Sequence, residues 1–118
     1  MSAVEPLRLL YYQTRDRRVP FRDWATGIVD PLAYAALMAR LARLRLGLFG
    51  DCKPVGEGVK ELRIDIGPGY RAYVASAGTG VVLLLCGGDK RSQPRDIRRA
   101  KNYWRDYEER SSSTRGSG

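Results

Sequence analysis

The fold is decided by the stretch Glu61-Leu62-Arg63-Ile64-Asp65-Ile66-Gly67-Pro68-Gly69-Tyr70-Arg71-Ala72-Tyr73. Its first half alternates apolar and polar residues, which is the two-residue period of a strand with one buried face. The glycines and the proline at 67–69 supply the backbone angles of a tight bend, and a second alternating run follows them. These residues therefore predict a β-hairpin.

Alternation also predicts how the two strands of this hairpin pair. Residues that lie opposite each other share a face of the sheet, so the apolar sets meet in three pairs: Ile66–Tyr70, Ile64–Ala72 and Leu62–Val74. The same register places Asp65 opposite Arg71 and Arg63 opposite Tyr73. The resulting polar face carries both arginines and is the expected working surface.

The rest of the chain supplies two strands and three helices around this hairpin. We expect a strand at 7–12, helices at 20–28 and from Asp30-Pro31 to about 47–50, a loop at 50–58, a buried strand at 81–86 and a last helix from Pro94 to Glu109. Leu37, Leu41, Leu44 and Leu48 form the apolar stripe of the second helix. This order predicts a single α+β domain over residues 1–110, with an antiparallel meander and helices on one side of it. A Ser/Gly-rich tail at 111–118 is expected to be disordered.

Composition narrows the classes of function. The chain has 118 residues, no histidine and a formal charge of +8, which favours a polyanionic partner such as nucleic acid over an acidic protein. Its two cysteines lack metal-site spacing and are expected to be structural. We expect no metal and no cofactor. No apolar run is long enough to span a membrane, and residues 1–6 do not resemble a signal peptide, so we expect a cytoplasmic protein.

Four residues are candidates for RNA cleavage by attack of a ribose 2′-OH on phosphorus. Guanidinium forks suit phosphate oxygens, so Arg63 and Arg71 are candidates to hold the phosphate. Tyr73 is a candidate proton donor or base-stacking ring. Lys90 is a candidate acid or base, because neighbouring cations disfavour the protonated form of an amine. Further RNA contacts are expected from Lys53, Lys60, Arg91 and Arg95.

Each of these features also has a purely structural interpretation. Arg71 opposite Asp65 is equally explained as a cross-strand ion pair. Asp89 and Lys90 are suited to capping the last helix or pairing with each other. The basic face of that helix suits simple solvation. Trp24 and Trp104 lie on apolar stripes, which favours a place in the core over base stacking.

Six motifs together resemble one known family: Phe49-Gly50-Asp51, Lys53-Pro54-Val55-Gly56-Glu57-Gly58-Val59, Glu61-Leu62-Arg63-Ile64, Gly67-Pro68-Gly69-Tyr70-Arg71, Leu85-Cys86-Gly87-Gly88-Asp89-Lys90 and Asp96-Ile97. Over about residues 7 to 107 they resemble the addiction-module killer proteins of the RelE/HigB-like toxin superfamily. The resemblance implies a small α+β domain that cleaves messenger RNA, commonly on the translating ribosome. It also implies a cognate antitoxin, usually a helix-turn-helix protein that binds operator DNA.

The resemblance assigns roles to individual residues. Arg71 is similar to the family's phosphate-stabilising arginine, Arg63 to a basic strand residue, and Lys90 to a basic residue near the scissile phosphate. Related toxins place a tyrosine or a histidine in the helix that follows, whereas this chain has Arg95-Asp96-Ile97. Tyr73 is the substitute we consider. A non-catalytic RNA- or ribosome-binding domain and a basic protein-interaction module are the alternatives to an endoribonuclease.

Overall fold

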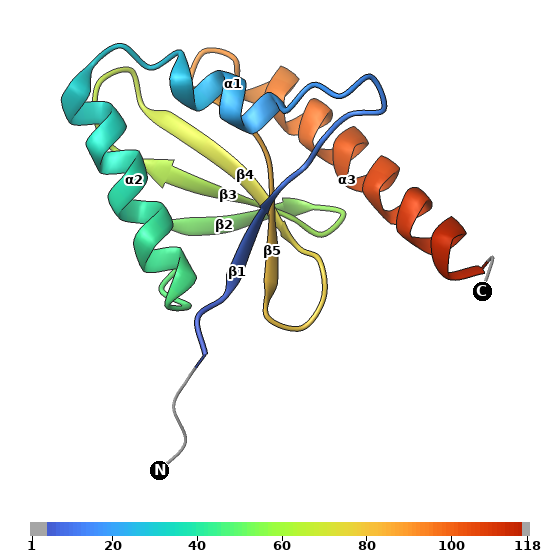
Figure 1. Cartoon of the computed structure of the whole chain (residues 1–118). Coiled ribbons are helices and arrows are strands. Elements are labelled where there is room, and N and C mark those ends of the chain that lie inside the picture. The colour runs from blue at the N-terminus through green and yellow to red at the C-terminus, as the bar shows by residue number, and fades with distance from the viewer. Residues whose placement is uncertain (1–4, 117–118) are drawn as a thin grey trace.

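The computed structural model describes residues 5–116; residues 1–4, where no signal peptide is expected, and 117–118 lie outside that range. The chain forms strands β1 (Arg8–Tyr11), β2 (Cys52–Gly56), β3 (Val59–Ile64), β4 (Tyr70–Ser76) and β5 (Val81–Asp89), and helices α1 (Pro20–Thr26), α2 (Pro31–Arg45) and α3 (Gln93–Gly116) (Figure 1). The predicted α+β class is confirmed. None of the helices in the described range is long and apolar enough to cross a membrane.

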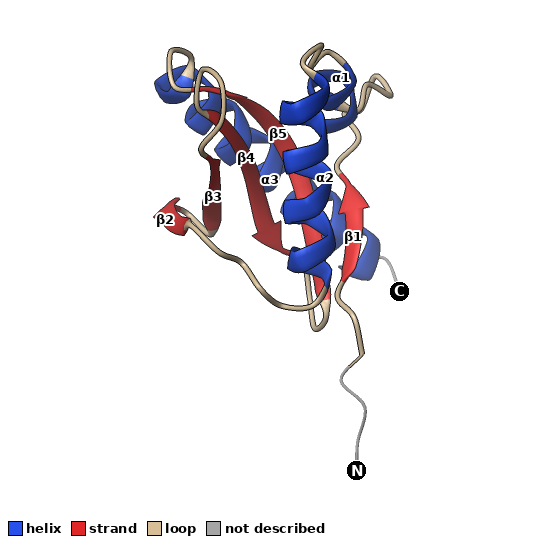
Figure 2. Cartoon of the chain, turned by 90° about the vertical axis from the view of Figure 1, so that its left-hand side faces the viewer, coloured by secondary structure: helices blue, strands red, loops and turns tan. Residues whose placement is uncertain are grey.

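The strands form one mixed sheet in the order β1-β5-β4-β3-β2 (Figure 2). The predicted meander of β3, β4 and β5 is antiparallel, but β1 pairs with β5 in parallel, so the sheet as a whole is not a meander. The loop predicted at 50–58 was wrong, because residues 52–56 pair with β3 as an edge strand. An edge strand accommodates Pro54 and a local register shift, which made this stretch read as a loop.

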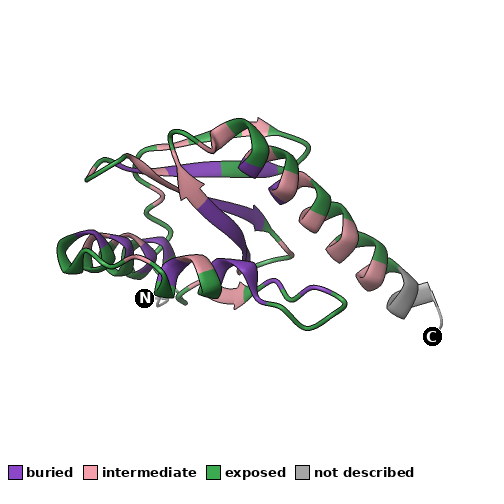
Figure 3. Cartoon of the chain, turned by 90° about the horizontal axis from the view of Figure 1, so that it is seen from above, coloured by how far each residue is buried: buried purple, intermediate pink, exposed green. Residues whose placement is uncertain are grey.

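Helices cover both faces of the sheet, not one as predicted (Figure 3). On the first face, α1 and α2 bury Phe21, Leu37, Leu41 and Leu44 against Leu62, Ile64, Ala72 and Val74. On the second face, α3 buries Ala100 against Val59, Tyr73, Leu83 and Leu85. Strand β5 is therefore buried on both sides, which confirms the prediction for residues 81–86. Trp24 packs against the first core and Trp104 against the second, as expected of core residues.

The predicted register of the hairpin was wrong by two residues. Ile64 pairs with Tyr70, and the connection spans residues 65–69 instead of the predicted three-residue turn. Inside it, the Ile66 amide donates to the Ile64 carbonyl at 2.9 Å, and Gly67 and Gly69 take positive φ values of 58° and 80°. A shift of two keeps every side chain on its face. It nevertheless brings Arg63 opposite Arg71 and Glu61 opposite Tyr73, and leaves the exposed Asp65 outside the ladder.

Strand β5 contains a bulge that affects the site. Val74 pairs with Leu84 but Tyr73 pairs with Cys86, so Leu85 is an extra residue on β5. Leu85 and Cys86 consequently both face the second core. Beyond the bulge, Gly88 lies opposite Arg71, on the face that α3 covers.

The ends of two helices differ from the sequence expectation. α2 ends at Arg45, so Leu48 lies outside it and is 55% exposed, although the predicted start at Asp30-Pro31 is confirmed by a hydrogen bond from the Leu32 amide to Asp30 Oδ1. The tail expected to be disordered from residue 111 continues α3 as far as Gly116. The apolar stripe of α3, formed by Ile97, Ala100, Trp104 and Tyr107, packs in the second core.

Candidate functional site

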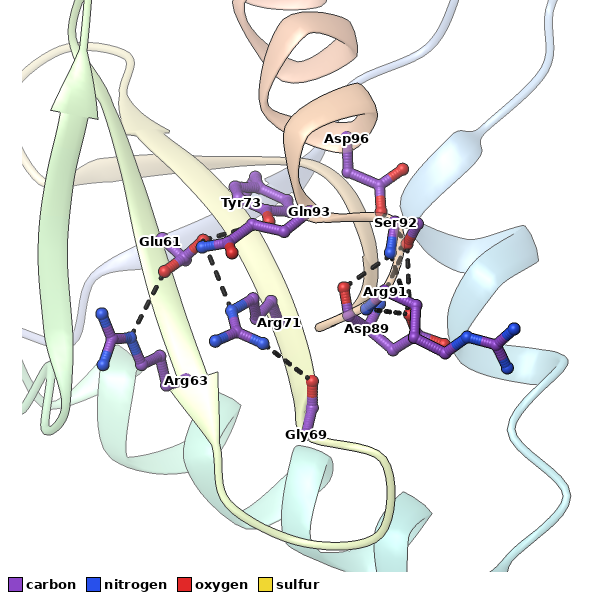
Figure 4. Close-up of polar contacts among 10 residues, drawn as sticks. All are labelled: Glu61, Arg63, Gly69, Arg71, Tyr73, Asp89, Arg91, Ser92, Gln93 and Asp96. Atoms are coloured by element: carbon purple, nitrogen blue, oxygen red, sulfur yellow. Dashed lines mark hydrogen bonds and ion pairs between the residues drawn. The ribbon is translucent and has the colours of Figure 1, made fainter.

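The polar face of β3 and β4 is built around one buried carboxylate, that of Glu61. Its side chain is 0% exposed. Oε2 accepts hydrogen bonds from Gln93 Nε2 at 2.8 Å and from the Tyr73 hydroxyl at 3.1 Å, and Oε1 accepts one from Arg63 Nε at 3.4 Å. Arg71 Nε lies 3.6 Å from Oε2 (Figure 4). Glu61 therefore links β3, β4 and the first turn of α3.

These contacts determine the ionisation of the cluster. Burial alone raises the pKa of Glu61, but hydrogen bonds from Gln93, Tyr73 and Arg63 and the charge of Arg71 outweigh it and hold the pKa below its usual value. Burial, with the adjacent Glu61 charge, raises the pKa of Tyr73 well above the usual value of a phenol. The carboxylate is therefore charged and the tyrosine neutral at physiological pH.

Arg63 and Arg71 lie directly opposite each other on neighbouring strands. Such like-charge pairs are unfavourable unless an anion lies beside them, and here Glu61 supplies one negative charge for two positive ones. Arg71 is 12% exposed and Arg63 39% exposed at the side chain. Arg71 Nη1 donates to the Gly69 carbonyl at 3.2 Å, whereas its Nε donates no hydrogen bond to the described residues. The pair retains donors for an added anion.

Lys90 lies at the same end of the sheet. A Cβ at Gly69 would be 3.7 Å from both Arg71 Nη1 and Lys90 Cβ, so the lysine and the arginine border the same glycine. Lys90 is exposed. Its neighbour Asp89 closes the turn before α3, accepting at Oδ1 from the amides of Arg91 at 2.8 Å and Ser92 at 3.1 Å. The Asp89 carboxylate is therefore engaged with the backbone of the turn that leads into α3, and not with an amide of the helix that it was expected to cap.

Tyr73 differs from the other three catalytic candidates. It is 0% exposed and belongs to the second core, so its ring offers no free face to a base. Its hydroxyl proton is directed at Glu61. Arg63, Arg71 and Lys90 border solvent at one end of the sheet, while Tyr73 lies beneath them.

The four expected RNA contacts separate into different surfaces. Lys53 is exposed and lies opposite Glu61 on β2, hence on the same face as the arginines. Arg95 is 69% exposed at the start of α3. Arg91 points away from the Glu61 cluster in Figure 4. Lys60 lies over the Phe49 ring, with Nζ 4.9 Å from the ring centre, and its strand position belongs to the opposite face.

Sequence reasoning missed Glu61 as the centre of the site and Gln93 as its partner. Glu61 carried one signal, an acidic residue in a strand flanked by buried positions. Gln93 carried none, since its contact with Glu61 depends on where α3 begins above the sheet.

Comparison with known proteins gives one relative and no family model that matches. An uncharacterized protein of Haemophilus influenzae is 47% identical over 81 residues, which span 69% of this chain and 82% of that protein. This chain belongs to the same family. Identity at this level over most of both sequences implies that the two proteins share a fold.

In chemical terms, the end of the sheet beside Glu61 presents a cationic surface. Two guanidinium groups lie over a buried carboxylate at one end of the sheet, and the exposed Lys90 borders the same glycine as Arg71. Guanidinium pairs of this kind bind tetrahedral oxyanions through two parallel hydrogen bonds. The described residues contain no group of three or more His, Cys, Asp or Glu side chains placed to hold a metal ion.

Proposed function

We propose that this protein is the toxin of a type II toxin–antitoxin module, a metal-independent endoribonuclease with a RelE-like fold that acts on messenger RNA. The observation that carries the proposal is the pairing of Arg63 with Arg71 over the buried Glu61. A phosphodiester that becomes a phosphorane gains negative charge, and preorganised guanidinium groups stabilise that charge. The chain's net charge of +8 provides the long-range attraction for RNA.

Each residue then has a defined part in cleavage. Arg63 and Arg71 hold the non-bridging oxygens of the scissile phosphate. The ribose 2′-OH attacks phosphorus, the bond to the 5′ oxygen breaks, and the proton leaves the 2′-OH as another reaches the 5′ oxygen. Lys90 is the exposed group beside Arg71 that exchanges a proton with the substrate. Tyr73 is buried and acts through Glu61, which positions both arginines.

The proposal extends to location and partners. The protein acts in the cytoplasm on translated messenger RNA, with the ribosome holding the substrate. A cognate antitoxin, a helix-turn-helix protein that also binds operator DNA, neutralises it. Lys53 and Arg95 flank the arginine pair and are the outer contacts to RNA.

A second candidate function is occupancy without cleavage, in which the protein blocks translation by binding RNA or the ribosome. It is favoured by the burial of Tyr73, which leaves Lys90 as the single exposed proton-transfer group among the four candidates. General acid–base cleavage of RNA uses two proton transfers. A surface that offers one exposed group for both proton transfers is as well suited to binding RNA as to cleaving it.

Mapping of RNA 5′ ends after induced expression separates the two functions. We expect growth arrest with new 5′ ends inside messenger RNAs, and loss of both in Arg71→Ala. The matched control is Arg98→Ala, which removes the same charge from an exposed position on α3. Growth arrest without new 5′ ends would contradict the endoribonuclease and favour a protein that binds RNA or the ribosome without cleavage. Normal growth would refute both and leave a basic protein-interaction module.

A further inference from the structure

Helix α2 is apolar on two faces, and only one of them lies in the core. Its fifteen residues are all apolar or aromatic except for three arginines. The inner face packs on the sheet through Ala33, Leu37, Leu41 and Leu44. Figure 2 views the molecule from the side of α2, and no other described element lies in front of the helix. A helix that is apolar on all sides is normally buried on all sides, so the outer face of α2 lacks a partner within the described chain.

The exposed large apolar side chains of the described residues gather at this helix. Six of the seven lie between residues 29 and 48: Val29, Leu32, Tyr34, Met38, Leu46 and Leu48. Single exposed apolar side chains are normal, but a contiguous patch marks an interaction surface. Along the outer face, apolar residues recur at alternating spacings of three and four positions. This outer stripe consists of Leu32, Ala35, Ala39, Ala42 and Leu46.

The outer stripe has the spacing and the profile of a helix-packing seam. Alternating steps of three and four residues keep one line of side chains facing a neighbouring helix. The small alanines in the middle of the stripe allow a second helix to approach to about 8 Å between axes, and Leu32 and Leu46 are larger side chains at its two ends. Insertion into a membrane surface favours large side chains along the whole stripe. The profile therefore suits a helix of a protein.

Charge determines which kind of helix fits. Arg43 and Arg45 flank the outer stripe on its two sides, and both are exposed. Their side chains make no hydrogen bond or ion pair with the described residues. Residues 31–50 contain no Asp or Glu. Charges beside a seam select the partner helix by its charge, so these arginines call for acidic flanks.

A second copy of this chain does not supply such flanks. Its α2 carries the same arginines without an acid, and each copy has a formal charge of +8. A net charge of this size opposes self-association. The outer stripe is also remote from the arginine pair, because α2 covers the first face of the sheet and Arg71 lies on the face that α3 covers. A partner on the outer stripe leaves the arginine pair open.

We propose that the outer stripe of α2 docks an amphipathic helix of another protein, one with an apolar seam and acidic residues on both flanks. The inference goes beyond the proposed cleavage of RNA and does not depend on it. Leucines of the partner's seam cover the three alanines, and its carboxylates pair with Arg43 and Arg45.

The test follows two signals of the full chain by NMR. The methyl group of Met38, which borders the outer stripe, is labelled with 13C, and the indole of Trp104, in the second core, is the internal control. The probe is a synthetic peptide of three heptads with leucine at the seam and glutamate on both flanks. Its twin has lysine on the flanks. The glutamate peptide is expected to move the Met38 signal saturably and leave Trp104 in place, and the lysine peptide to bind at least about 10-fold more weakly.

Three variants localise the docking surface. Ala39→Glu places a carboxylate in the seam while keeping a good helix former, and is expected to weaken binding of the glutamate peptide by more than about 10-fold. Asn102→Glu adds the same charge at an exposed position of α3 and is expected to change the affinity by less than about 2-fold. Arg43→Gln removes one flanking charge and is expected to weaken binding by about 2–5-fold.

Several outcomes would overturn the inference. An unmoved Met38 signal, equal affinity of the two peptides, or equal losses in Ala39→Glu and Asn102→Glu would each do so. A Met38 signal that moves with protein concentration alone would assign the stripe to a second copy. Movement with vesicles of phosphatidylcholine and phosphatidylglycerol, without a response to the peptide, would assign it to a membrane surface. None of these measurements depends on cleavage, so the failure of the proposed function and the failure of this surface are distinguishable.

Discussion

Replacing the buried carboxylate is the sharpest test of the site's architecture. Glu61→Gln keeps the shape of the side chain and one oxygen, which still accepts from Tyr73 or Gln93. It removes the negative charge that lies 3.4 Å from Arg63 Nε and 3.6 Å from Arg71 Nε. The new amide N–H groups also face guanidinium donors. Two opposed cations and a donor–donor contact then remain in a largely buried place.

The expected loss of stability follows from burial. Removing one partner of a buried ion pair costs about 3–5 kcal/mol. Arg63 is 39% exposed and Arg71 12% exposed, so solvent screens part of the charge that is left, and one accepting oxygen remains. We therefore expect the free energy of unfolding at pH 7 to fall by about 2–4 kcal/mol. Urea unfolding of both proteins measures this loss of stability, and we expect the m-value to be unchanged.

The pH dependence gives the same prediction a second, independent test. The pKa of Glu61 in the folded chain lies below its ordinary value of 4.5, so the carboxylate stabilises the fold above that pH. This contribution is lost as the pH falls through the lower, folded-state pKa. Gln does not titrate. The difference between wild type and Glu61→Gln should therefore be largest near neutral pH and narrow below pH 4.5.

The matched control is Glu57→Gln. Glu57 is 56% exposed and pairs with Lys101 at 3.7 Å and Arg105 at 3.4 Å on the surface. Exposed pairs contribute less than about 1 kcal/mol. If Glu61→Gln costs no more than this control, or if its effect is the same at pH 3 and pH 7, then Glu61 does not organise the arginine pair as described.

Two further predictions concern positions on β5. Gly87→Ala should lower the free energy of unfolding by about 1–3 kcal/mol, because the new methyl group would overlap the Trp24 ring. The control is Gly27→Ala, whose Cβ would meet only carbonyl oxygens at 3.4 Å. Equal stabilities of the two variants in urea unfolding would contradict this packing. Burial chiefly raises the pKa of Cys86 to about 12, so at pH 8 the native chain should be alkylated at the partly exposed Cys52 well before Cys86. Mass spectrometry of the folded and urea-unfolded chain checks this, and equal labelling of both thiols in the folded chain would contradict it.

The alternation in residues 61–73 predicted the hairpin and the face of each side chain in its paired strands, but not the partners. A strand repeats every two residues, so a register shifted by two satisfies the same pattern. The length of the connection decides between such registers, and the hydrogen bond that tightens residues 64–66 is not visible in composition. This is why Asp65 was predicted opposite Arg71, where Arg63 in fact lies.

The parts of the fold that depend on distant contacts were not predictable in this way. β2 contains a proline and a glycine and becomes a strand because β3 offers it a free edge. β1 pairs with β5 in parallel although two helices and three strands separate them in the chain, and no local pattern in either stretch indicates this pairing. The contact of Gln93 with Glu61 joins residues that are 32 positions apart.

The observed register changes how the charges on the polar face are balanced. In the predicted register, Asp65 neutralises Arg71, and the surface is balanced by a residue that a substrate must displace. In the observed register, the counter-charge lies beneath the arginines and is 0% exposed, so an incoming phosphate does not compete with it for the outer donors. Glu61 offsets one of the two positive charges and restrains both side chains. The arginine pair with Glu61 is left with one net positive charge, which allows it to hold a phosphate without first breaking an ion pair.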